Sequence, residues 1–318
     1  MRITRFIGLL MVAALLAAAG CTHKDLCFDH SHVAELCVRF DWKKAPDAHP
    51  EGMTVYFYGS DGYVGHFDLQ GREGGIVRLP VGTYDVIAYN NDCQATRASG
   101  VSAFGSHGLF TSECSVLEPA SQQGSSVPEG MSGERVVAAS DMVWSALGRG
   151  ISVSENAGSE MQEIILCSEQ LVAVYTVEVR GIKGLERVDA ISGSLSGLSA
   201  SVALESGMLS AERVTIPFAI EKAAPDRVRG RFCVFGHSGD CSGGHRLLLY
   251  LWMSSGHKFV MGLDSERFDV ASQIHGAENI REVHIVIDGL TIPQTIGEGS
   301  GFNPSIDDWI EVDVSLDI

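Results

Sequence analysis

Short stretches in which apolar and polar residues alternate run through most of the chain. In residues 53–58, for example, every second side chain could face one side of a strand: Met53, Val55 and Phe57. Residues 59–62 then read Gly-Ser-Asp-Gly, and Asp and Gly tolerate the positive φ that tight turns require. This alternation with turns between the stretches predicts short β-strands joined by hairpins, as in a sandwich or barrel. No amphipathic pattern predicts a helix longer than about three turns.

The expected strands fall into two sets, separated by a glycine- and serine-rich stretch at residues 121–133 and a boundary near 148–158. The first set includes residues 33–41, 53–58, 63–69, 76–80 and 84–89. The second includes residues 162–166, 171–180, 188–193, 214–220, 232–235, 245–253, 258–263, 282–287 and 310–316. We therefore expect an N-terminal domain of residues 33–150 and a C-terminal domain of residues 151–318.

The first twenty residues differ from the rest. Arg2 and Arg5 precede an apolar stretch at residues 7–19, which is too short to span a bilayer, since spanning takes roughly 20 residues. Such a stretch is typical of a secretory signal. It ends in Ala-Ala-Gly before Cys21, which resembles the lipobox of bacterial lipoproteins. That resemblance implies that residues 1–20 are removed, that Cys21 is lipidated and that residues 21–32 form a tether. The alternative is a plain secretory signal followed by an incidental cysteine.

The chain of 318 residues is acidic, with 23 Lys and Arg against 40 Asp and Glu and a formal net charge of −17. Counterion release cannot favour the approach of such a surface to phosphates, so broad binding to nucleic acid is disfavoured. Direct electrostatic attraction to anionic lipid is disfavoured for the same reason. Attachment to a membrane would therefore depend on the lipid at Cys21.

The residues after Cys21 bear on location. Lys24 followed by Asp25 resembles the surface-export signal of Bacteroidetes lipoproteins, although that signal usually carries more than one acidic residue. The resemblance implies an outer-membrane protein on the cell surface. A solvated tether at the periplasmic face is the alternative.

Two further segments resemble a known family. Residues 79–84 read Leu-Pro-Val-Gly-Thr-Tyr, similar to the corner of transthyretin-like sandwiches, and residues 302–314 resemble the ending of fimbrillin-type proteins. With the lipobox, the whole chain resembles a Bacteroidales fimbrillin-like lipoprotein family of unknown function, related to lipidated fimbrial anchor subunits. The resemblance implies an all-β fold of two tandem transthyretin-like (Greek-key) β-sandwich domains. It also implies a structural or adhesive role in fimbriae, with fimbrial subunits or other surface proteins as partners.

The last residues could form a strand that pairs with a partner. One face of this segment is apolar, and the candidate partner-strand residues are Trp309, Ile310, Val312, Val314 and Leu316. An added strand satisfies the unpaired N–H and C=O groups of an open sheet edge. The alternative is that the segment is simply the last strand of its own domain.

The remaining candidate chemistry is sparse. Cys233 and Cys241 flank a plausible hairpin tip and could form a disulfide in an exported protein. His237, Cys241 and His245 could meet at the same hairpin, but no orienting carboxylate can be assigned, so we expect no metal and no cofactor. No nucleophile elbow or phosphate-binding loop is present, so we expect no enzyme.

The sequence thus predicts a lipid-anchored surface protein, a fimbrial anchor or accessory subunit that acts through protein–protein contacts. The alternative is a surface glycan-binding lipoprotein, in which exposed aromatic side chains stack on sugars. Trp42, Tyr56 and Tyr58 are the candidates for such stacking.

Overall fold

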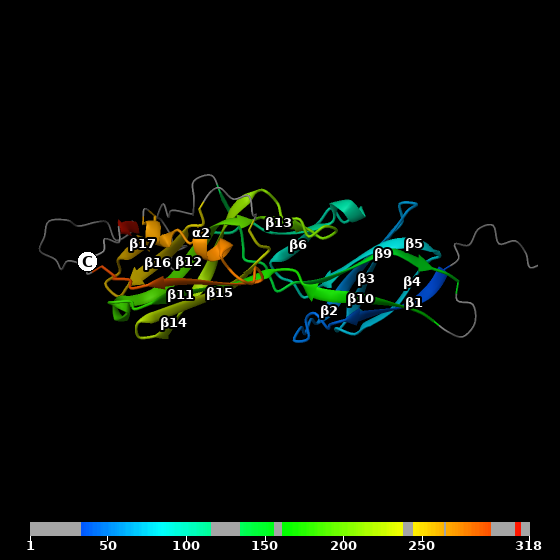
Figure 1. Cartoon of the computed structure of the whole chain (residues 1–318), viewed down its shortest axis with the longest axis horizontal. Helices are drawn as coiled ribbons and strands as arrows, with labels where there is room; N and C mark the ends of the chain where they lie inside the picture. The colour runs from blue at the N-terminus through cyan, green and yellow to red at the C-terminus, as the bar shows by residue number, and fades with distance from the viewer. Residues whose placement is uncertain are drawn as a thin grey trace, which may run out of the picture.

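A computed structural model of the chain describes residues 33–115, 134–155, 161–237, 244–263, 265–293 and 309–312. Strands dominate these residues and form three sheets, which confirms the all-β prediction. A seven-stranded and a nine-stranded sheet lie at opposite ends of an elongated molecule, and a three-stranded sheet lies between them (Figure 1). No helix in these described ranges is long and apolar enough to cross a membrane.

The seven-stranded sheet folds over a core of its own. Its order is β3-β2-β5-β9-β10-β1-β4. Alternate side chains of β1 and β4 pack against those of β2 and β5, among them Leu36, Val55, Val77 and Val86, so the sheet closes into two layers. The strands are β1 (Val33–Asp41), β2 (Gly52–Gly59), β3 (Val64–Gln70), β4 (Gly74–Pro80), β5 (Gly82–Asn90), β9 (Trp144–Val153) and β10 (Gln162–Gln170).

The corner between β4 and β5 is held by a tyrosine. The ring of Tyr84 is buried in the core, and its hydroxyl donates a hydrogen bond of 2.6 Å to the carbonyl oxygen of Pro80. Pro80 ends β4 and Gly82 begins β5, so a single residue separates the strands. The tyrosine of the sequence Leu-Pro-x-Gly-x-Tyr therefore stabilises this corner, through a hydrogen bond from its side chain to the backbone four residues earlier.

The nine-stranded sheet contains the largest core. Its order is β18-β11-β15-β14-β12-β16-β17-β19, with β8 on β14. Tyr175 and Val177 of β11 share a core with Phe218 of β14 and Leu249 of β16, so this sheet also closes into two layers. The strands are β8 (Arg135–Val136), β11 (Ala173–Arg180), β12 (Val188–Ser199), β14 (Arg213–Ala224), β15 (Arg227–Val234), β16 (Leu247–Met253), β17 (Lys258–Met261), β18 (Glu282–Asp288) and β19 (Trp309–Val312).

The three-stranded sheet joins the two ends. It consists of β6 (Thr96–Ser99), β7 (Gly108–Thr111) and β13 (Ser201–Ala203), in the order β13-β7-β6. Leu109 and Val202 from this sheet pack with Tyr58 and Ile87 of the seven-stranded sheet. The short helices are η1 (Phe104–Ser106), η2 (Leu185–Arg187), η3 (Glu266–Phe268) and α2 (Ala271–His275).

The expected strands largely match those observed, but their assignment to sheets was less predictable. β10 lies within residues 151–318, yet it pairs in parallel with β1 in the N-terminal sheet. Sheet membership changes between β10 and β11, after Gln170. The division at residue 150 and the transthyretin-like class of each half stay predictions.

Candidate functional site

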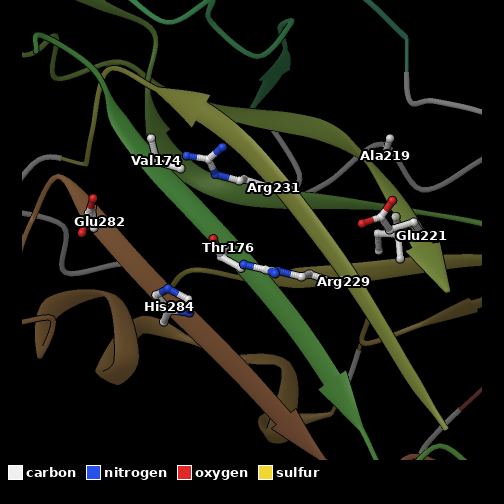
Figure 2. A pocket seen from close by; sticks show the side chains of 9 residues that line it. Val174, Thr176, Ala219, Glu221, Arg229, Arg231, Glu282 and His284 are labelled. Atoms are coloured by element: carbon white, nitrogen blue, oxygen red, sulfur yellow. The ribbon is translucent and has the colours of Figure 1, made fainter. Parts of the chain in front are cut away.

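An open groove of about 690 Å³ crosses the outer face of β18, β11, β15 and β14 (Figure 2). Its floor is low because β11 contributes short side chains there, Val174 and Thr176, which are 7% and 4% exposed. Longer side chains rise around this floor. The polar residues that line the groove are Thr176, Glu221, Arg229, Arg231, Glu282 and His284.

Strand register explains why these residues meet. Thr176 of β11 pairs with His284 of β18 on one side and with Arg231 of β15 on the other. Because successive side chains of a strand point to opposite faces, the neighbours Tyr175 and Val177 enter the core while Thr176 faces out. These two residue pairs, which share Thr176, bring three separate strands to the same point of the groove.

Two guanidinium groups dominate the centre of the groove. Figure 2 shows the side chains of Arg229 and Arg231 reaching from β15 toward β11. Within the described ranges, no ion pair links either arginine to a carboxylate. Arginine presents a rigid fork of donors that matches a carboxylate. The groove thus offers donors to an acidic ligand on a protein whose net charge is negative.

A neighbouring carboxylate is already satisfied. Glu178 of β11 forms ion pairs with Arg180 at 3.0 Å and with Arg227 at 3.2 Å. Hydrogen bonding to Arg180 lowers the pKa of the Glu178 carboxyl, and the charges of Arg180, Arg227 and Arg229 act in the same direction. Glu178 is thus engaged by Arg180 and Arg227, whereas Arg231 lies opposite Thr176, two residue pairs further along the ladder between β11 and β15.

Some of the predicted site residues lie outside the residues that the structure describes, and the others lie within them. Cys21, Lys24, Asp25 and Cys241 lie outside the described residues, as do Val314 and Leu316. Cys233 lies half-buried on β15, where burial raises the pKa of its thiol. Its predicted disulfide with Cys241 stays a prediction.

The backbone of the C-terminal segment does form a strand. β19, which contains Trp309, Ile310 and Val312, pairs in parallel with β17 of the same chain. Four residue pairs make up this ladder, from Lys258 with Trp309 to Met261 with Val312. In this structure residues 309–312 are an edge strand of their own sheet.

The three aromatic residues considered for sugar stacking do not form a platform. Trp42 and Tyr58 are each only 7% exposed, and the guanidinium carbon of Arg72 lies 5.1 Å from the centre of the Trp42 ring. Tyr56 is half-buried and stacks on His66 with ring centres 4.5 Å apart. These positions therefore give no support to the glycan-binding alternative.

The groove arginines were missed from sequence although a signal existed. Residues 227–231 read Arg-Val-Arg-Gly-Arg, which places three arginines on one face of a strand. We expected the strand to begin only at residue 232, so this face went unrecognised. Among the described residues, no three His, Cys, Asp or Glu side chains already stand in position to hold a metal ion.

Comparison with known proteins places these features in context. A family described as "Domain of unknown function (DUF5119)" matches residues 20–219. A protein of Bacteroides ovatus named "Putative fimbrium anchoring subunit Fim4B" is 27% identical over 240 residues, which are 74% of this chain and 66% of that protein. The chain thus spans just under two thirds of the length of this relative.

Solved structures resemble the fold. The crystal structure of a "putative adhesin" from Bacteroides ovatus superposes with a TM-score of 0.57 at 21% identity, over 87% of this chain and 99% of that one. The fimbrial anchor protein Mfa2 from Porphyromonas gingivalis gives a TM-score of 0.45 at 12% identity, over 80% and 90% of the two chains. The first match supports the fold, and the second is too weak to bear on function.

Proposed function

The chain belongs to the DUF5119 family, a domain of unknown function, and on that premise we propose that it is a lipid-anchored protein of the cell surface. It acts as a fimbrial anchor or accessory subunit, through protein–protein contacts rather than catalysis. The observation that carries this proposal is the relationship, over 74% of the chain, to a protein named as a fimbrium anchoring subunit. The all-β fold is consistent with such a role.

The anchor is Cys21, at the end of the apolar N-terminal stretch. A single acyl chain holds a protein only marginally, whereas several chains hold it firmly, because each buried CH₂ contributes about 0.8 kcal/mol. The tether of residues 21–32 then carries Lys24 and Asp25, which direct the protein to the outer face. Such an arrangement would fix the base of a fibre to the outer membrane.

The contact with a neighbouring subunit involves the C-terminal strand. β19 is the last strand of its sheet and is held by a ladder of only four residue pairs. Detaching a short parallel edge strand costs little free energy. Once released, an extended strand can add to another open sheet edge. Residues 309–316 are therefore the segment that we expect to pair with a fimbrial subunit.

The groove on the nine-stranded sheet provides a second contact surface. Arg229 and Arg231 can receive carboxylates from an acidic segment of a neighbour through charge-assisted hydrogen bonds. An exchange of Arg231 for Glu would reverse the charge at this point and weaken that contact. The core would not change, because Arg231 is exposed.

The test is recovery of surface complexes from the native host after cross-linking of intact cells. The full chain should bring down fimbrial subunits, and a chain lacking residues 307–318 should not, while both fold alike by circular dichroism. Glu311→Gln serves as the matched control because it keeps the backbone and the alternation of β19. Recovery of glycan but of no fimbrial subunit, unchanged by the deletion, would instead favour the glycan-binding alternative.

A further inference from the structure

Three histidine rings from three separate segments meet beside the core of the nine-stranded sheet. His237 follows β15, His245 precedes β16 and His275 ends α2. Their ring centres lie 5.5 Å apart for His237 and His245, 4.9 Å for His237 and His275, and 5.1 Å for His245 and His275. The three distances are nearly equal, so the rings form a triangular cluster.

This spacing has a simple chemical meaning. Imidazole nitrogens bind Zn²⁺ at about 2.0–2.1 Å, and three of them in a tetrahedral arrangement hold their ring centres about 5 Å apart. Neutral aromatic rings also pack at such distances, so the spacing alone does not distinguish a metal site from ordinary packing. A second observation, on the buried ring, favours a bound ligand.

His245 is fully buried and one of its nitrogens lacks a hydrogen-bond partner. Its Nδ1 lies 3.1 Å from the carbonyl oxygen of Ser196. A carbonyl can only accept, so Nδ1 carries the proton and Nε2 presents a bare lone pair. The Nε2 atom has no partner among the described residues, although the ring is 0% exposed. A buried polar atom without a partner is costly, and metal ligation would satisfy it.

The second ring is oriented in a related way. Nδ1 of His237 lies 2.7 Å from the hydroxyl of Tyr175, which is itself fully buried. Metal-bound histidines usually donate their other ring N–H to such a partner, which fixes the orientation of the ring. When Nδ1 of His237 donates to the Tyr175 hydroxyl, Nε2 of His237 carries a lone pair, as Nε2 of His245 does.

From this arrangement we infer a binding site for a divalent transition ion of the zinc type, formed by the imidazoles of His237, His245 and His275. The three side chains do not yet converge on one point. His275 is exposed at the end of a short helix, so a turn of its side chain can complete the site. Three histidines leave a fourth position for water. The bound ion would link the end of α2 to the end of β15 and to the start of β16.

The test uses the full chain in detergent, freed of metal by chelation, with ZnCl₂ as the probe. Competition with a chromogenic chelator measures how many zinc ions each chain binds at micromolar zinc. His275→Ala and His237→Ala remove one ligand each. His284→Ala, an exposed histidine of β18 outside the cluster, is the matched control.

Wild type and His284→Ala should bind one more zinc ion per chain than the other two variants. The affinity lost in those two should be at least about tenfold, since even the loss of an outer partner of a ligand costs about 10–100-fold. Zinc should also raise the melting temperature of wild type but not of His275→Ala. Equal zinc binding by all four proteins, or none by wild type, would overturn the inference, whatever the outcome for the fimbrial role.

Discussion

His107 links the three-stranded sheet to the N-terminal sheet and makes stability depend on pH. Its ring is 0% exposed, and its Nδ1 lies 2.6 Å from the hydroxyl of Tyr58. That hydroxyl donates to the carbonyl oxygen of Val101 at 3.1 Å, so it is free to accept from Nδ1. Burial lowers the pKa of His107 to about 4, and Nε2 has no partner among the described residues. The folded protein therefore holds this ring neutral.

The sign and size of the effect follow from linkage. Because the folded pKa of about 4 lies below the ordinary value of 6.5, the unfolded chain binds a proton more readily between these values. Stability is therefore fully present above pH 6.5 and falls with pH until about pH 4. The full loss is about 3 kcal/mol, and about 2 kcal/mol of it is reached by pH 5.

The perturbation is His107→Phe, which keeps a ring of similar size and cannot be protonated. Urea unfolding at pH 8 and pH 5 gives the free energy of unfolding for wild type, for His107→Phe and for the control His284→Phe on the exposed face of β18. Wild type and the control should lose about 2 kcal/mol more than His107→Phe between these pH values. Equal losses in all three proteins would refute the assignment of His107 as a buried neutral group.

Three further predictions test particular contacts of the fold: one hydrogen bond, one hydrogen-bond network and one strand pairing. Tyr84→Phe removes the bond to Pro80 and should lower the free energy of unfolding by about 1 kcal/mol in urea; no change would mean that the corner holds without it. Glu134 accepts hydrogen bonds from Gly197, Thr215 and Arg213, so Glu134→Gln should cost about 1–3 kcal/mol. In the same assay, Glu113→Gln, in an exposed ion pair, should cost under about 1 kcal/mol, and equal costs would count against the network. Deleting residues 309–318 should speed hydrogen exchange in β17 (Lys258–Met261) but not in β11, and unchanged exchange in β17 would contradict its pairing with β19.

Local pattern explains which strands could be predicted. The apolar run of residues 247–253 predicted a buried strand, and β16 is indeed covered on both faces, with Leu249 in one core cluster and Tyr250 in another. The corner at Tyr84 was similarly readable, because it depends on residues close in sequence. Other strands could not be predicted from local pattern, because they form only where a neighbouring strand is available to pair with them. The strands β6, β7 and β13 are only three or four residues long and carry little alternation of their own.

The sites were harder to predict than the strands for the same reason. The groove depends on the register between β11, β15 and β18, and β18 begins 48 residues after the end of β15. The histidine cluster shows the limit most clearly. His237 and His245 could be considered together from sequence, but His275 joins them only through the placement of α2. Sequence spacing alone therefore gave no reason to expect three ligands.

Deletion of the gene in its native host tests the central claim most directly. Fimbrial subunits are then measured on washed cells and in the culture medium, in the deletion strain with or without the restored gene. If the protein anchors fimbriae, the subunits should move from the cells to the medium in the deletion strain and return to the cells when the gene is restored. An unchanged distribution of fimbrial subunits would contradict the proposed role as an anchor.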